Sequence, residues 1–246
     1  MKRLNFLTAI AAAGSLLLLV SCNSGENKSG NESSSDTTAV KPDTTATTPA
    51  TNPSGPLSVM TIKHKVANYA KWKAAYDAHD SDRQANGLHN YIIARGVDDS
   101  NMVMVALKMD DVDKAKAMGA SNALKERMKK AGVVGPTAID YTTAVMNDTT
   151  ALQQTIRVIV KHKVKDFDAW KKVFDSHKQA RMDAGLTDRV VGYTAGDNHN
   201  VTVVFAVADL AKAKAFMNSK DLKDKMKEGG VEGPPSIFFY RIAEKY

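Results

Sequence analysis

KHKVANYAKWKAAYDAHDSDRQANG, residues 63–87, returns 98 residues later as KHKVKDFDAWKKVFDSHKQARMDAG, residues 161–185. The same offset holds without a gap from Lys63 to Ile139, where 29 of 77 positions are identical to their partners. Self-similarity at a fixed offset means that one structural unit occurs twice in the chain. Polar residues kept in both copies are candidates for a site that the two units share.

Each copy predicts the same order of elements, β-α-β-β-α-β. In the first copy the strands show period-two alternation and the helical stretches show apolar residues three and four apart. The first helix ends at Gly87, and the second helical stretch contains a break near Gly119 to Ser121. The expected elements are a strand over 60–66, a helix over 67–87, strands over 88–95 and 102–109, a helical stretch over 111–130, a loop over 131–136 and a strand over 137–145. This order is typical of a ferredoxin-like unit, with two helices on one face of an antiparallel sheet.

The central strands are apolar on both faces, since Val103 and Val105 alternate with Met104 and Ala106. A sheet with one face in water would alternate apolar with polar residues. Each sheet therefore needs cover beyond its own helices, and the sheet of the other copy is the obvious cover. We expect an α+β fold in which two tandem ferredoxin-like repeats pack as an intramolecular eight-stranded α/β barrel, a monomer with the form of a dimer.

These residues resemble the dimeric α/β-barrel superfamily, which includes antibiotic-biosynthesis monooxygenases and small proteins named cyclases. The resemblance covers about Leu57 to Tyr246 and rests on three pairs of matching segments: 63–87 with 161–185, KAKAM (114–118) with KAKAF (212–216), and GVVGP (132–136) with GVEGP (230–234). It implies the barrel fold. It says little about activity, because the superfamily includes oxygenases, haem proteins, isomerases and binding modules. In the resembled monooxygenases, a cleft between helices and sheet holds an aromatic substrate without flavin or metal.

The chain begins like an exported protein. Lys2 and Arg3 precede an apolar run that is too short to span a bilayer. The run ends in LVSC (19–22), which resembles a bacterial lipobox and implies cleavage before Cys22 and acylation of that residue. The expected division is a signal peptide and lipobox over 1–22, a flexible Ser/Thr/Pro-rich tether over 23–56, repeat 1 over 57–145, a linker over 146–155 and repeat 2 over 156–246.

This beginning indicates where the protein acts and what it contacts. Its expected partner is a lipid bilayer, reached through acylated Cys22, in the envelope of a Gram-negative bacterium, either in the periplasm or on the outer membrane. Asp-Thr-Thr triplets at 36–38, 43–45 and 148–150 resemble O-glycosylation acceptors of Bacteroidetes, which makes that phylum a candidate. Cys22 is the only cysteine, which excludes an internal disulfide. The net charge of +7 comes without a one-sided basic stripe, so we expect no nucleic-acid partner.

One stripe on the first helix carries the residues of chemical interest. Trp72, Tyr76, His79 and Arg83 are spaced by four, three and four residues, so they share one face. His64 lies on the preceding strand among apolar neighbours and is expected to be buried. The second copy repeats the set as His162, Trp170, Phe174, His177 and Arg181. Alternation alone does not decide whether the two strand histidines face the helix stripe or the opposing sheet.

Three interpretations of this set remain open: structural packing, a small-molecule pocket and a metal site. In a pocket, the arginines would favour an anionic group and the aromatic residues an aromatic one. His64 or His79 could then serve as general base in a cofactor-independent monooxygenase or isomerase, with Tyr76 present in the first copy alone. For a metal, each copy supplies two histidines and no repeated acid, so we expect no metal and no cofactor. A non-catalytic envelope scaffold is a further alternative to the expected ligand-binding function, and whether the protein is an enzyme stays open.

Overall fold

The computed structural model describes residues 56–246. The predicted signal peptide, the acylation site at Cys22 and the predicted tether up to residue 55 lie outside the described residues. Within the described part, no helix has both the length and the apolar character that a bilayer crossing requires.

The two repeats contain the same succession of strands and paired helices. Repeat 1 comprises β1 (Ser58–Val66), α1 (Tyr69–Asp77), α2 (Asp80–Ala85), β2 (Leu88–Gly96), β3 (Met102–Met109), α3 (Val112–Ala120), α4 (Asn122–Lys130) and β4 (Val133–Asn147). Repeat 2 comprises β5 (Ile156–Val164), α5 (Phe167–Ser176), α6 (Lys178–Asp183), β6 (Leu186–Thr194), β7 (Asp197–Val207), α7 (Leu210–Met217), α8 (Lys220–Glu228) and β8 (Val231–Lys245).

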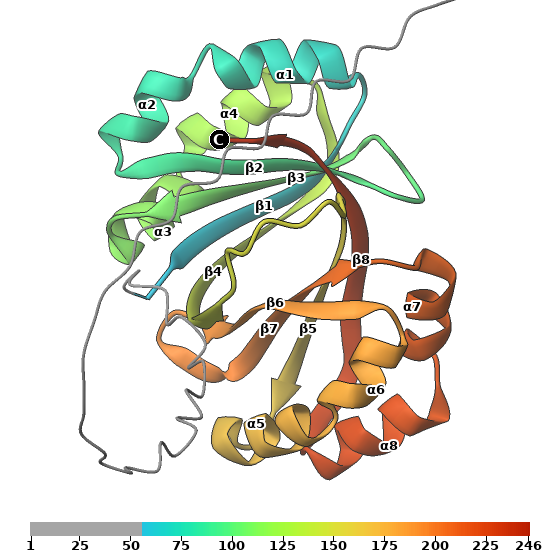
Figure 1. Ribbon diagram of the computed structural model, residues 1–246. Helices are drawn as coiled ribbons and strands as arrows, with labels where there is room; N and C mark the ends of the chain where they lie inside the picture. The colour runs from blue at the N-terminus through green and yellow to red at the C-terminus, as the bar shows by residue number, and fades with distance from the viewer. Residues whose placement is uncertain (1–55) are drawn as a thin grey trace, which may run out of the picture. The chain divides into compact units, whose positions relative to one another are not determined.

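The eight strands form one closed antiparallel barrel in the order β1-β3-β2-β8-β5-β7-β6-β4. The 15-residue strands β4 and β8 close it, because each pairs with its own repeat along its first part and with the other repeat along its last part. Figure 1 shows the helices of repeat 1 and those of repeat 2 on opposite outer sides of the barrel. The predicted tandem ferredoxin-like barrel is confirmed.

The symmetry of the ring relates the two repeats. All neighbouring strands are antiparallel, and β1 and β5 are four places apart, so these two strands run parallel on opposite sides of the barrel. The pseudo-twofold axis therefore coincides with the barrel axis. Residues that are equivalent by the 98-residue offset lie at the same end of the barrel and face each other across it.

Three separate cores explain why the strands are apolar on both faces. Two cores lie between the outer face of the barrel and the helices of each repeat, around Met60 and Trp72 in repeat 1 and around Val158 and Trp170 in repeat 2. The third fills the lumen of the barrel and includes Met104, Ala106, Ile159 and Tyr240. His64 follows Met60 and Ile62 in alternation, so it faces the helices, which settles the point that the sequence leaves open.

The helix predicted over 67–87 is in fact two helices, α1 and α2, with a break at Ala78 and His79. The break leaves carbonyl groups at the end of α1 without helical partners. Arg83 stabilises this end of α1, because its Nη1 donates at 2.7 Å to the Tyr76 carbonyl, which also accepts from the His79 N–H. The break expected near Gly119 to Ser121 is confirmed, since Ser121 ends α3 and its hydroxyl caps α4 by accepting from Leu124 N.

The segment predicted as a loop over 131–136 belongs mainly to β4, which begins at Val133. There the pairing of β4 with β1 shifts register between Lys63 and Lys65, so that the backbone opposite His64 bulges. Gly135 has a φ of 72°, which favours glycine at this position. The same bulge lies opposite His162 in repeat 2, where Gly233 has a φ of 69°.

Candidate functional site

Each repeat has a pocket between its helices and the outer face of the barrel, and the two pockets are built from equivalent positions. The free volume is about 80 Å³ in repeat 1 and about 60 Å³ in repeat 2. All ten residues that the sequence singled out line one of the two pockets: His64, Trp72, Tyr76, His79 and Arg83 in repeat 1, and His162, Trp170, Phe174, His177 and Arg181 in repeat 2.

His64 and His162 are the least satisfied polar residues of the described part. They are 3% and 8% exposed, and all four of their ring nitrogens are buried without a hydrogen-bond partner. The hydroxyl of Tyr69 is the one other buried side-chain polar atom without a partner among residues 56–246. A buried polar group without a partner costs about 1–3 kcal/mol. Both repeats therefore lose stability at equivalent positions, because each keeps a buried imidazole without hydrogen-bond partners.

Burial also decides the charge of these imidazoles. It lowers the pKa of His64 to about 4 and that of His162 to about 4, because the charged form loses hydration that no neighbour replaces. Both rings are neutral at pH 7. A neutral imidazole offers one N–H donor and one acceptor nitrogen.

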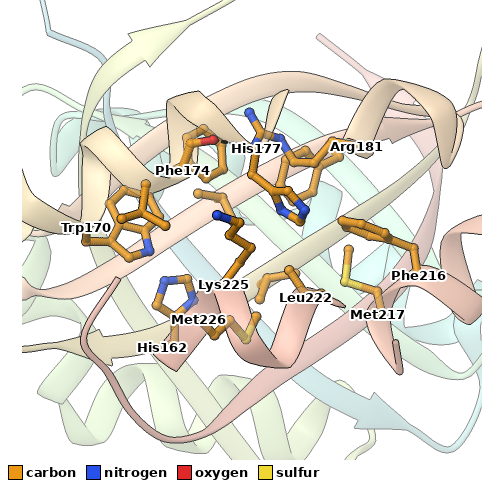
Figure 2. Close-up of a pocket in the computed structure, with 14 residues that line it drawn as sticks. His162, Trp170, Phe174, His177, Arg181, Phe216, Met217, Leu222, Lys225 and Met226 are labelled. Carbon is orange, nitrogen blue, oxygen red and sulfur yellow. Dashed lines mark hydrogen bonds between the residues drawn. The ribbon is translucent and has the colours of Figure 1, made fainter. Parts of the chain in front are cut away.

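A stack of aromatic rings forms one wall of each pocket. The rings of Trp72 and Tyr76 stack with centroids 5.2 Å apart, and the His64 ring lies 5.6 Å from the indole. In repeat 2, Trp170 stacks on Phe174 at 5.0 Å and His162 lies 5.4 Å from the indole. Figure 2 shows the His162 ring beside Trp170. The wall places an apolar surface next to the unpartnered imidazole.

The two arginines are engaged in bonds within the protein. Arg83 donates to the Tyr76 carbonyl, to Asp80 at 3.0 Å and to Asn90 at 3.2 Å, and its guanidinium lies 3.7 Å from the Tyr76 ring centroid. Arg181 donates to the Phe174 carbonyl, as Figure 2 shows, and makes a bidentate pair with Asp188 at 2.7 and 2.8 Å. These bonds fix the helix break and the neighbouring strand.

The difference between Tyr76 and Phe174 has a structural explanation. The Tyr76 hydroxyl donates to Asn90 Oδ1, and burial raises the pKa of this phenol above its usual range. The position equivalent to Asn90 is Asp188, whose carboxylate oxygens are both taken by Arg181. Repeat 2 therefore needs no phenol here.

The histidines at the helix break differ more than the sequence suggests. His79 is 45% exposed at its side chain and contacts Asp82 at 3.3 Å. His177 is buried, and its Nε2 lies 2.7 Å from a carboxylate oxygen of Asp221 on α8. Repeat 1 instead joins its helices through Asp82 and Arg127, 3.0 Å apart.

His89 and His199, the two histidines without a counterpart in the other copy, lie within strands β2 and β7, where both are exposed. His89 pairs with Asp110 at 2.8 Å, and His199 Nδ1 lies 3.0 Å from the Val164 carbonyl. Neither lines one of the two pockets.

Sequence reasoning missed the residues of the last helix that cover each pocket. Leu124, Arg127 and Met128 of α4 line the first pocket, and their equivalents in the second are Leu222, Lys225 and Met226 of α8. The 98-residue offset carried a signal, because the leucine and the methionine are identical in both copies. Neither α4 nor α8 contains a buried residue. No group of three or more His, Cys, Asp or Glu side chains within residues 56–246 could hold a metal ion.

Comparison with known proteins shows the fold. No protein-family model and no curated protein matches the chain. A solved structure of an anthrone oxidase-like protein matches with a TM-score of 0.54 at 13% identity, covering 79% of this chain and 94% of its own. A candidate monooxygenase from Fusobacterium nucleatum subsp. nucleatum matches with a TM-score of 0.50 at 11% identity, covering 77% of this chain and 93% of its own. The chain therefore has the tandem ferredoxin-like fold, the dimeric α/β barrel, found in structures of this kind.

Proposed function

We propose that each helix–sheet pocket binds a small, neutral, mainly apolar molecule that carries one hydrogen-bonding group, such as a phenol. The observation that carries the proposal is the pair of buried imidazoles without partners, His64 and His162. A hydroxyl group both donates and accepts, so it can pair with either nitrogen of a neutral ring. The stacked aromatic wall supplies the surface for the apolar part of the ligand.

The electrostatics of the pocket favour a neutral ligand over an anionic one. Arg83 and Arg181 give their N–H groups to carbonyl and side-chain oxygens of the protein, and Asp188 neutralises Arg181 directly. The imidazoles of His64 and His162 carry no charge at pH 7 because burial lowers their pKa. The other cations that line the pockets, Arg127 and Lys225, are paired with Asp82 and Glu228. An anion in either pocket would therefore lose its hydration without gaining an unpaired cation.

The size of the pockets restricts how a ligand enters. Volumes of about 60 and 80 Å³ are well below the roughly 150 Å³ of a cavity that takes up benzene. Helices α4 and α8 cover the pockets without burying a residue, and they contribute the flexible side chains of Met128 and Met226. A ligand the size of one ring therefore requires a small outward shift of these helices.

Catalysis by His64 as general base is the weaker alternative. An efficient general base has a pKa close to the working pH. A pKa of about 4 makes the His64 imidazole a poor proton acceptor at pH 7. His79, the other predicted base, is half exposed and contacts Asp82. The geometry supports hydrogen bonding to a ligand better than proton removal from it.

The test compares two probes that differ by one hydroxyl, p-cresol and toluene. The wild-type protein should bind p-cresol about fivefold more tightly, as expected for one net hydrogen bond of about 1 kcal/mol. The His64→Phe/His162→Phe double variant keeps an apolar ring of similar size and should lose this preference while it still binds toluene. Affinities from calorimetry or NMR titration decide the outcome. A double variant that still prefers p-cresol, or a wild-type protein that binds neither probe, contradicts the proposal.

We also propose that the protein is an exported lipoprotein, anchored in a Gram-negative envelope by acylated Cys22. The support is the n-region, apolar run and LVSC sequence at 1–22. In a Gram-negative host, the wild-type chain should fractionate with membranes and begin at an acylated Cys22, as read by mass spectrometry. The Cys22→Ser variant should carry no acyl chain. Wild-type protein with an unmodified cysteine would refute the anchor.

A further inference from the structure

A second group of polar residues lies at one end of the barrel lumen, away from both helix–sheet pockets. Because His64 and His162 face the helices, the lysines that precede them, Lys63 and Lys161, face the lumen. Strands β1 and β5 are parallel on opposite sides of the ring, so both ammonium groups lie at the same end. Burial lowers the pKa of Lys161, and Asp140 opposes this effect. The positive charge of Lys63 lowers the pKa of Lys161 further, so the two ammonium groups repel each other.

The pseudo-twofold symmetry is broken at this end of the barrel. Lys161 donates a hydrogen bond to Asp140 on β4. The position equivalent to Asp140 is Phe238, and the Lys63 Nζ lies over its ring, 5.0 Å from the centroid. Within residues 56–246, Lys63 forms no ion pair. Of the two ammonium groups, only that of Lys161 is paired with a carboxylate, so the charge of Lys63 is left without a counter-ion in a partly enclosed site.

The space beside these residues suits a small ligand. A depression of about 230 Å³ opens next to Lys161. Hydroxyl and amide side chains line it together with Asp140, His162 and Lys163, the equivalent of Lys65. Thr202 is among them and is buried, whereas Asn200 is held by Asp197. This volume exceeds that of several water molecules, each of which occupies about 30 Å³.

We propose that this end of the lumen binds a small oxyanion, a carboxylate or a phosphate, between Lys63 and Lys161. Both ammonium groups can donate charge-assisted hydrogen bonds to such an anion, with Thr202 as a further donor. The low dielectric of the lumen strengthens the attraction relative to a lysine on the open surface. The two lysines lie on the other face of the sheet from the helix–sheet pockets, although His162 lines both the depression and the pocket of repeat 2.

The test uses inorganic phosphate and acetate as separate probes at constant ionic strength, followed by NMR titration. Wild-type protein should bind at least one of them, and the tighter probe distinguishes a phosphate from a carboxylate ligand. Lys63→Met should weaken binding by roughly tenfold or more, the effect of one lost charge-assisted contact. Phe238→Asp gives Lys63 the carboxylate that Lys161 already has, and should cause a similar loss without removing a lysine.

Lys220→Met is the control, because Lys220 is an exposed lysine on helix α8, outside the barrel, and its loss changes the net charge equally. Its affinity should stay within about twofold of wild type, since exposed charges are screened by salt. The proposal is overturned if wild type binds neither probe, if Lys63→Met binds as tightly as wild type, or if Lys220→Met weakens binding as much as Lys63→Met does. A thermal melt of each variant identifies any that fails to fold. If Phe238→Asp does so, Lys63→Met carries the test.

Discussion

Lowering the pH from 7 to 5 should destabilise this protein through two residues, His64 and His162. Their imidazoles are buried and neutral in the folded state, and burial lowers each pKa from 6.5 to about 4. In the unfolded chain they regain the ordinary value of about 6.5. Between pH 6.5 and 4 the unfolded state therefore binds more protons than the folded state, and stability falls as the pH falls.

The magnitude follows from these two pKa values. Between pH 7 and pH 5, proton linkage lowers the free energy of unfolding by about 2 kcal/mol for each imidazole, or about 4 kcal/mol for both. Above pH 7 the contribution no longer changes, and below pH 4 both states are protonated. A loss of about 4 kcal/mol is a large part of the stability of a typical domain, about 5–15 kcal/mol.

The assay is urea unfolding at pH 7 and pH 5 for wild type and for His64→Phe/His162→Phe. The double variant should lose about 4 kcal/mol less on acidification, and it should be at least as stable as wild type at pH 7, because four unpartnered nitrogens are gone. Each single variant should recover about half. His89→Gln is the control, since its side chain is 49% exposed and pays no burial cost. Parallel losses in wild type and double variant would refute the assignment of buried, neutral imidazoles.

Three further variants test the packing around the pockets. Arg181→Met leaves the mostly buried Asp188 without its partner, so urea unfolding should show a loss of about 3 kcal/mol in the free energy of unfolding. An unchanged free energy of unfolding would mean that the ion pair does not stabilise the fold. Gly119→Ala places a methyl group 2.0 Å from the Tyr141 hydroxyl, so thermal melting should show a loss of about 1–3 kcal/mol, and adding Tyr141→Phe should recover much of it. Gly233→Ala forces a side chain into a φ of 69° and should cost about 1 kcal/mol; an unchanged melting temperature would mean that the bulge is not needed.

Much of the fold was predictable because repetition and alternation are local properties of the sequence. The 98-residue offset identified two copies, and strands that are apolar on both faces required a second layer of cover. The break between α1 and α2 was not predictable from spacing, since the stripe Trp72, Tyr76, His79 and Arg83 keeps helical periodicity through it. At the break Arg83 reaches back to the Tyr76 carbonyl, a contact that is visible only in three dimensions.

The candidate site divides in the same way. The sequence by itself determined which residues are shared by the two copies, because selection of a residue type at a fixed offset is visible without coordinates. The tertiary structure alone decided their roles: His64 and His162 have no partners, whereas Arg83 and Arg181 have several. The physical reason is that the energy of a polar group depends on its burial and on the atoms around it, and those atoms come from distant strands and helices.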